Sequence, residues 1–437
     1  MTFRSKVSPR YLLSCALSLL GNSVAGVILP LVLLATTGDA LAAGTLALIC
    51  ALPQMLIGLV GGALIDRLNR RDVSIASDVL SAASVALLPV VDMTVGLDFG
   101  WFVALGLLGA VGDIPGMTAR DALLPAVCDH DYRSLQKFMG MSQSVESLTA
   151  IAGPALAAFL LTLTGGVSAL WLTAALSLAA ALVTLTLPRS IGRVGDGAAA
   201  PAGGRGGIAS GAVAALRDGV RVLFRDDALL RSSTLLTFGI IMVMGSFQGL
   251  VLPVHFTAAG TPELLGFVLS ALSAGMLVSS LAYSALAHRL RRRTWLIASL
   301  SGIAVGVAVL GSLASFPVML AGALAVGLSA GPASALLGFF AFDRIPADRR
   351  GAALGTQNSL TLAAAPAAVF ASSAVTEAGG APLAALVLVG CWLAVTLWAL
   401  ATPSLRHLDG EEDAPSAAGR RERGRAAAGG RGPEGAL

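Results

Sequence analysis

The fold is decided by the stretch Gly62-Ala63-Leu64-Ile65-Asp66-Arg67-Leu68-Asn69-Arg70-Arg71, which separates two long apolar runs. Residues 40–65 carry no charge, and residues 73–91 carry a single charge, that of Asp78. A membrane-spanning helix needs about 20 apolar residues. The stretch therefore predicts a short charged turn between two membrane spans.

The composition extends this interpretation to the whole chain. Of its 437 residues, 56% are hydrophobic and 12% are charged, whereas soluble domains carry roughly 25% charged residues. The four cysteines have neither paired nor metal-ligand spacing, so no disulfide framework and no metal site is predicted. The net charge of +4 comes from basic residues scattered over membrane-flanking loops, so no nucleic-acid partner is indicated.

Twelve segments are long and apolar enough to span a membrane. They lie at residues 11–36, 41–65, 73–91, 99–119, 137–163, 168–188, 233–254, 264–287, 295–313, 317–341, 352–374 and 382–402. We expect an N-terminal six-helix bundle at 1–188, a cytoplasmic linker at 189–232, a C-terminal six-helix bundle at 233–407 and a disordered cytoplasmic tail at 408–437. In the linker, Arg217, Arg221 and Arg225 follow one another at helical spacing, which indicates an amphipathic helix on the membrane surface or a plain solvated helix.

The distribution of charge fixes the expected orientation. With twelve spans, all 29 Lys and Arg residues fall on the side of the two termini. The loops of the other side carry only acidic charges, at Asp39, Asp92, Asp98, Glu263 and Glu377. Basic loops stay in the cytoplasm, so we expect a multi-pass protein of the bacterial cytoplasmic (inner) membrane with both termini in the cytoplasm.

The two halves repeat each other weakly. Pro115 corresponds to Pro332, and Gly153-Pro154 corresponds to Ala365-Pro366, at nearly the same separation along the chain. A basic turn at 288–293 follows the stretch at 62–71 at a similar separation, although it lacks the Asp. Internal repeats are typical of secondary transporters, whose substrate site lies near the membrane midplane between the halves.

The spacing G-x-x-x-D-R-x-x-R-R at 62–71 resembles the signature of the major facilitator superfamily between its second and third helices. The segment from Pro115 to Pro125 resembles the P-x-x-x-A-R-x-A-x-x-P stretch of the branch that includes enterobactin exporters and macrolide efflux proteins. Ser77-Asp78 and Gly153-Pro154 are also similar to that branch. Members often have an acidic residue after a Gly in the first span, whereas this chain has Gly21-Asn22.

The resemblance implies an all-α membrane protein with twelve transmembrane helices in two pseudo-symmetric six-helix halves. It also implies a secondary transporter, working by alternating access, that exports a small amphipathic compound such as a drug, a macrolide, a siderophore or a natural product. The expected partners are this small molecule, protons and the lipid bilayer. We expect a monomer without cofactor, driven by the proton gradient.

The signature loop is expected to act as a gate. Gly62 allows a neighbouring helix to approach closely. Asp66 is expected to pair with an Arg of its own turn or of a facing helix and so to lock the cytoplasmic side. Arg67, Arg70, Arg71 and Arg120 complete this gating set. The alternative is an ordinary basic loop that only fixes orientation.

Three acidic residues fall within the predicted spans, Asp78, Asp113 and Glu146. Charges inside a membrane are costly and tend to be functional, and desolvation favours the protonated form of a carboxyl group. We expect Glu146 to be the main proton-coupling group, with Asp113 or Asp78 second. For Asp78 and Asp113 we favour a structural role, pairing with nearby Arg side chains; Asp113 and Arg120 are spaced so that they share one helix face.

Amide side chains in otherwise apolar spans mark an expected substrate cavity, because an amide in hydrocarbon needs a partner. Helix–helix hydrogen bonding is the alternative for each of them. The candidates are Asn22, Gln54, Gln143, Gln248, Gln357 and Asn358.

Other classes of function remain open at this point. A membrane enzyme would need clustered nucleophilic, metal-binding or phosphate-handling residues, but the four histidines are dispersed, so we expect no catalytic site. No G-x-x-x-x-G-K-[ST] motif is present, which argues against ATP-driven pumping. A proton-coupled importer and a non-transporting scaffold or receptor on the same fold are the remaining alternatives.

Overall fold

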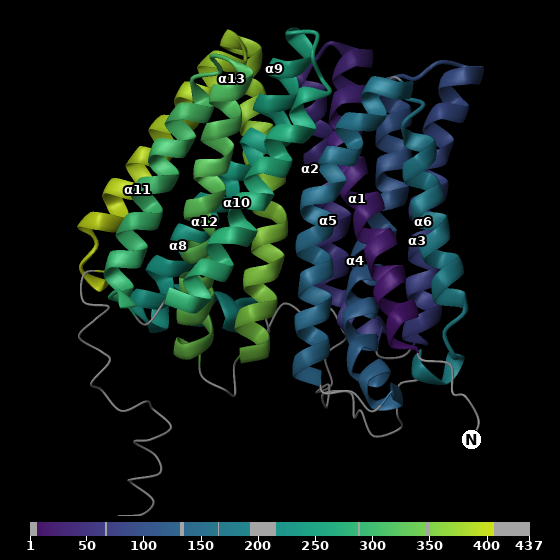
Figure 1. Cartoon of the computed structure of the whole chain (residues 1–437), viewed down its shortest axis with the longest axis horizontal. Helices are drawn as coiled ribbons and strands as arrows, with labels where there is room; N and C mark the ends of the chain where they lie inside the picture. Colours follow the sequence, from purple (N-terminus) through teal and green to yellow (C-terminus); the bar gives the residue numbers. More distant parts are fainter. Residues whose placement is uncertain are drawn as a thin grey trace, which may run out of the picture.

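The computed structural model describes residues 7–65, 68–131, 135–164, 166–192, 216–286, 289–345 and 350–405. The described residues form helices and short connections, with no strand among them. Two bundles of long, roughly parallel helices lie side by side, the N-terminal half on the right and the C-terminal half on the left of Figure 1.

Six long helices build the N-terminal half. They are α1 (Ser8–Thr37), α2 (Ala40–Ile65), α3 (Arg70–Thr94), α4 (Phe99–Asp131), α5 (Leu135–Thr164) and α6 (Leu170–Leu185), followed by the short 3₁₀ helix η1 (Arg189–Gly192). Asn69 begins α3, since its side chain accepts a hydrogen bond from the backbone N–H of Arg71. Helix α4 continues well beyond the predicted end at residue 119, so that Arg120 lies well inside the helix.

The C-terminal half has its own six spans. They are formed by α8 (Ala228–Ser246) with the π turn η3 (Phe247–Val251) and α9 (Leu252–Ala258), then α10 (Leu264–Leu286), α11 (Arg292–Gly311), α12 (Phe316–Arg344) and α13 (Arg350–Ala401), which the 3₁₀ helix η5 (Pro403–Leu405) follows. Helix α13 provides two spans, because the backbone leaves the helical conformation at Gly379 and Gly380, where Gly380 has a φ of +73°.

The prediction of twelve spans in two halves is confirmed within the described chain. Nine described helices are long and apolar enough to cross a membrane, α13 among them with its two spans. The shorter apolar stretches of α2 and α6, Ala40–Met55 and Leu170–Leu185, complete the set.

The linker is described only in part, since residues 193–215 lie outside the described residues. Residues 216–221 are helical and run into the π turn η2 (Val222–Asp226). Val222 and Leu223 are buried against Ile345, while the predicted stripe of Arg217, Arg221 and Arg225 is exposed. The apolar side of this amphipathic segment therefore packs on the C-terminal half.

The following helix begins earlier than the predicted residue 233. Asp227 starts α8, because its carboxylate accepts hydrogen bonds from the backbone N–H groups of Leu229 (2.7 Å) and Leu230 (3.0 Å). This side chain satisfies donors that a helix start leaves unpaired.

The start of α1 is fixed by a residue from another helix. Asp131, the last residue of α4, accepts hydrogen bonds from the Ser8 hydroxyl (2.6 Å) and from the backbone N–H groups of Ser8 (2.7 Å) and Val7 (3.2 Å). It acts as an N-cap supplied from outside the helix. We call this end of the bundle, where α1 begins and Arg10, Arg70 and Arg189 lie, the basic face.

The Asp131 cap gives a first prediction. Replacing Asp131 with alanine should lower the free energy of unfolding by about 0.5–2 kcal/mol, the usual cost of losing an N-cap. Thermal unfolding in detergent would measure the loss, and Asp129→Ala is the matched control, because Asp129 is exposed. Equal effects of the two substitutions would contradict the capping role.

Candidate functional site

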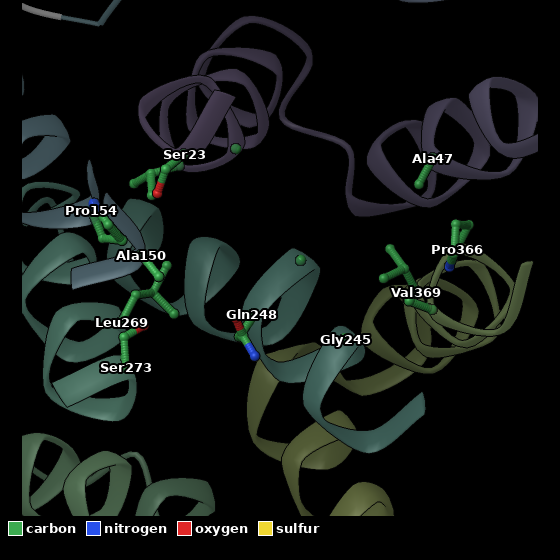
Figure 2. Close-up of a pocket in the computed structure, with 14 residues that line it drawn as sticks. Ser23, Ala47, Ala150, Pro154, Gly245, Gln248, Leu269, Ser273, Pro366 and Val369 are labelled. Atoms are coloured by element: carbon green, nitrogen blue, oxygen red, sulfur yellow. The ribbon is translucent and has the colours of Figure 1, made fainter. Parts of the chain in front are cut away.

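A cavity of about 470 Å³ lies between the two halves. It is lined by helices α1, α2 and α5 of the first half and by α8, η3, α10 and α13 of the second (Figure 2). Its lining residues are small or apolar, with three polar side chains among them. They are Ser23, Gly26, Val27, Ala47, Ala150, Pro154, Gly245, Gln248, Gly249, Leu269, Ser273, Ala365, Pro366 and Val369.

The lining is pseudo-symmetric. Four lining residues of α1 and α2 each have a counterpart in the lining of the second half, always at the same separation along the chain, which we call the sequence offset. The pairs are Ser23 with Gly245, Gly26 with Gln248, Val27 with Gly249, and Ala47 with Leu269. Pro154 of α5 and Pro366 of α13 form a further pair, at a slightly shorter offset. The two copies of the internal repeat predicted from the sequence therefore meet at this cavity.

The π turn η3 carries the one amide in the cavity lining. Gln248 and Gly249 belong to this wide turn, and π turns inside α-helices are frequent at functional sites. Gln248 is one of the lining residues labelled in Figure 2. Gln248 was predicted as a cavity residue, and the structure places it there.

Glu146 lies one helical turn from the cavity, towards the basic face. It precedes Ala150 by four positions and so shares the inner side of α5 with it. The outer side of α5 carries Leu148, which is 61% exposed. Glu146 is nevertheless exposed, and its carboxylate has no hydrogen bond or ion pair within the described chain.

Several of the predicted amides lie on the same side of the cavity. Asn22 precedes Gly26 by one turn, and a spacing of two turns relates Gln143 to Ala150 and Asn358 to Ala365. Gln54 follows Ala47 by the same spacing on α2, which runs in the opposite direction. Two turns bring a helix back to nearly the same face. These four amides therefore extend the cavity walls towards the basic face, whereas Gln357 lies off this face.

Asp78 and Arg120 form a buried ion pair inside the N-terminal half. Nη2 of Arg120 lies 2.8 Å from Oδ1 and 2.9 Å from Oδ2 of Asp78. The Ser18 hydroxyl of α1 donates to Oδ1 of Asp78 at 2.8 Å, and the Tyr11 hydroxyl donates to the backbone carbonyl of Arg120 at 3.0 Å. The pair thus ties α1, α3 and α4 together.

The expected structural pairing with an Arg is found for Asp78 but not for Asp113 among the described residues. Arg120 turns to Asp78 of α3, and Asp113 is left without a hydrogen bond or ion pair among the described residues. Asp113 is only partly buried.

The signature loop is described in part. Asp66 and Arg67 lie outside the described residues, as do the surroundings of Gly62, so the expected pairing of Asp66 stays a prediction. Arg70 donates to the carbonyl of Ala122 at 3.1 Å, which joins α3 to α4.

Arg71 joins α3 to the end of α6. It donates to the carbonyl of Leu185 at 2.6 Å and pairs with Asp72 at 2.9 Å. Asp72 in turn holds Arg189 at 2.7 Å. These described contacts all lie within the N-terminal half.

Two seams join the halves beside the cavity, on the side away from the basic face. At the first seam, a Cβ on Gly266 of α10 would overlap the Pro154 carbonyl and approach Cβ of Ala158 to 2.7 Å. The Ser270 hydroxyl also donates across this seam to the Ile151 carbonyl at 2.8 Å.

The second seam repeats the first. A Cβ on Gly44 of α2 would approach Cβ of Ser373 to 2.7 Å and Cα of Phe370 to 3.0 Å. Gly44 and Gly266 stand at the same sequence offset as the cavity pairs of α1 and α2. The halves therefore meet at two equivalent glycines, whereas the cavity walls nearer the basic face carry exposed side chains such as Glu146 and Asn358.

Most of the cavity-lining residues were not predicted from the sequence. Glycine, alanine and single apolar residues are abundant in every span, so they give no signal on their own. Pro154 and Pro366 had been recognised as a repeated pair, and extending that pairing along the helices finds the other lining positions.

A helical bundle of two repeats around a central cavity defines the class of secondary transporters. The family model of the Major Facilitator Superfamily matches residues 11–256 and 234–428. The chain therefore belongs to this superfamily and is a multi-pass membrane protein.

Two efflux proteins are similar to the chain in sequence. The chain is 30% identical over 394 residues to the multidrug efflux pump Tap of Mycolicibacterium fortuitum, covering 89% of this chain and 94% of that protein. It is 25% identical over 302 residues to macrolide efflux protein A of Streptococcus pyogenes, covering 68% of this chain and 71% of that protein.

Solved structures share the fold at low identity. The nucleoside transporter NupG (D323A mutant) superimposes with a TM-score of 0.74 at 13% identity, over 91% of this chain and 100% of that chain. A bacterial homologue of the iron transporter ferroportin, in an inward-facing state, gives 0.68 at 16% identity, over 90% of this chain and 97% of that chain.

Proposed function

We propose that this protein is a proton-coupled exporter of small amphipathic compounds in the bacterial cytoplasmic membrane. The basic face is the cytoplasmic face, because basic loops stay inside, and both termini lie there. Substrate enters the cavity from that side and leaves by alternating access, with the two seams opening on the other side.

One observation carries this proposal. The cavity lies between the two repeats, and an exposed carboxylate without a partner in the described chain, Glu146, lies one turn from its lining. A carboxylate within a membrane span is costly and marks a proton or substrate pathway. The efflux names of the relatives agree with this direction of transport.

Glu146 is proposed as the main proton-coupling group. Asp113, also without a partner among the described residues, is the second choice, while Asp78 is held by Arg120 and is proposed as a structural residue. We propose a monomer that uses the proton gradient and no cofactor.

The test is proton antiport in inside-out vesicles, read with a pH-reporting dye and a panel of macrolides, siderophores and cationic dyes. Wild-type vesicles should release protons from their interior when a substrate is added. Glu146→Gln should abolish this release, because an amide carries no titrating proton, while membrane insertion is retained.

The matched control is Glu377→Gln, the same chemical change at an exposed position far from the cavity along α13. It should leave the response unchanged. Full coupling in Glu146→Gln would remove that residue from the mechanism, and proton movement in the opposite direction would indicate import.

A further inference from the structure

The cavity walls carry one charge, and it is negative. None of the lining residues is charged. Six spans form the cavity walls. We consider the two helical turns of each span that follow the lining residues towards the basic face. These turns contain one ionisable carboxylate, Glu146, and no Lys, Arg or His. These turns therefore offer a charged substrate a carboxylate and no cation to compensate it.

The charge is also restricted to one half. Glu146 and Asn358 stand at the same sequence offset that relates Pro154 to Pro366, so they are pseudo-equivalent positions on α5 and α13. Both side chains are exposed. The second half thus presents a neutral amide, on a side chain one methylene shorter, where the first half presents a carboxylate.

The remaining polar groups around the cavity are neutral. Among them are the hydroxyls of Ser23 and Ser273 and the amide of Gln248, with the amides of Asn22, Gln54, Gln143 and Asn358 nearer the basic face. These groups offer hydrogen bonds but no positive charge. An anion would have to leave water without an ionic partner and beside a carboxylate, which is strongly unfavourable in low dielectric.

We propose that the substrates of this cavity are amphipathic cations, protonated amines or quaternary onium compounds, and that Glu146 selects their charge. The apolar body of the substrate contacts Val27, Leu269 and Val369, and its cationic group lies towards Glu146. This inference deepens the proposed function and rests on the same cavity.

Equilibrium binding to the purified full-length protein tests the charge preference directly. The probes are tetraphenylphosphonium, tetraphenylborate and triphenylphosphine oxide, which are bulky aryl compounds with positive, negative and no charge. Their charges do not change with pH. The wild type should bind the phosphonium about tenfold or more tightly than either of the others, the range expected for a charge contact that the bound probe shields from water.

Variants then assign the preference to Glu146. Glu146→Gln should lose about tenfold in phosphonium affinity and keep its affinity for the phosphine oxide, whereas Glu146→Asp should retain the preference. The double variant Glu146→Gln with Asn358→Asp moves the carboxylate to the pseudo-equivalent position and should restore part of the phosphonium affinity.

Equal wild-type affinities for the three probes would overturn the inference without any variant being needed. A Glu146→Gln variant that weakens all three probes alike would also overturn it. Proton antiport with neutral compounds alone would leave the proposed export standing while this inference fails. Phosphonium binding through Glu146 without any proton movement would support the inference and refute proton-coupled export.

Discussion

Replacing Asp78 with asparagine is expected to lower the free energy of unfolding of the N-terminal half by about 3–5 kcal/mol, the cost of leaving one buried charge unpaired. Asp78 is 3% and Arg120 is 9% exposed, so solvent cannot replace the lost carboxylate. Nε of Arg120 already has no hydrogen-bond partner among the described residues, and the substitution removes the negative charge and one of the two acceptor oxygens that Nη2 contacts. The thermal unfolding midpoint in detergent would measure the loss.

The matched control is Asp113→Asn, the same chemical change at a carboxylate that has no partner among the described residues. It should have little effect on the unfolding midpoint. The double variant Asp78→Asn with Arg120→Gln removes both charges and should recover part of the lost stability. Equal losses in Asp78→Asn and Asp113→Asn would show that the ion pair is not the cause.

Gly266→Leu is expected to abolish transport while both halves remain folded. The side chain has no room at the seam, because a Cβ alone would overlap the backbone of α5 at Pro154. The interior of a protein is too densely packed to absorb such a change, so the halves cannot close on this side. Gly44→Leu should have the same effect at the equivalent seam.

Cysteine labelling would measure the opening of the seam. The labelled chain has its four natural cysteines replaced and a single cysteine at Ser273 of the cavity. An impermeant maleimide is added on the side opposite the basic face. The cysteine should react faster in Gly266→Leu than in the otherwise identical chain with Gly266. Gly390→Leu is the matched control, because nothing lies within 4 Å of a Cβ at Gly390. Unchanged labelling in Gly266→Leu, with transport intact, would show that this contact does not control closure.

The spans, their number and the repeat were predictable from the sequence because each depends on local patterns. A run of about 20 apolar residues has no alternative to a helix in lipid. The kink at Gly379–Gly380 separates two spans that the hydropathy pattern had already placed apart. The continuation of α4 to Asp131 was missed, because the helix leaves the apolar run there and its end is held by contacts with α1.

The ion pair was only half predictable. Asp78 and Asp113 were both expected to pair with one of the nearby Arg side chains, Arg120 among them, but the sequence did not tell which carboxylate Arg120 would choose. Its actual partner, Asp78, lies 42 positions away on α3, and only the packing of α3 against α4 brings the two together. Sequence spacing predicts contacts within one helix, whereas contacts between helices depend on how the bundle is packed.

The two sequence offsets within the repeat have a consequence for protein engineering. Cavity positions of α1 and α2 share one offset to their counterparts, as Ser23 and Gly245 show, and those of α5 share a shorter one, as Pro154 and Pro366 show. The halves therefore differ in length between their second and fifth spans. Before and after that difference, equivalent positions of the cavity helices stay aligned one to one. Chimeras that exchange α1 with its α8–η3 counterpart, position by position, would thus keep the lining residues of these two helices in register.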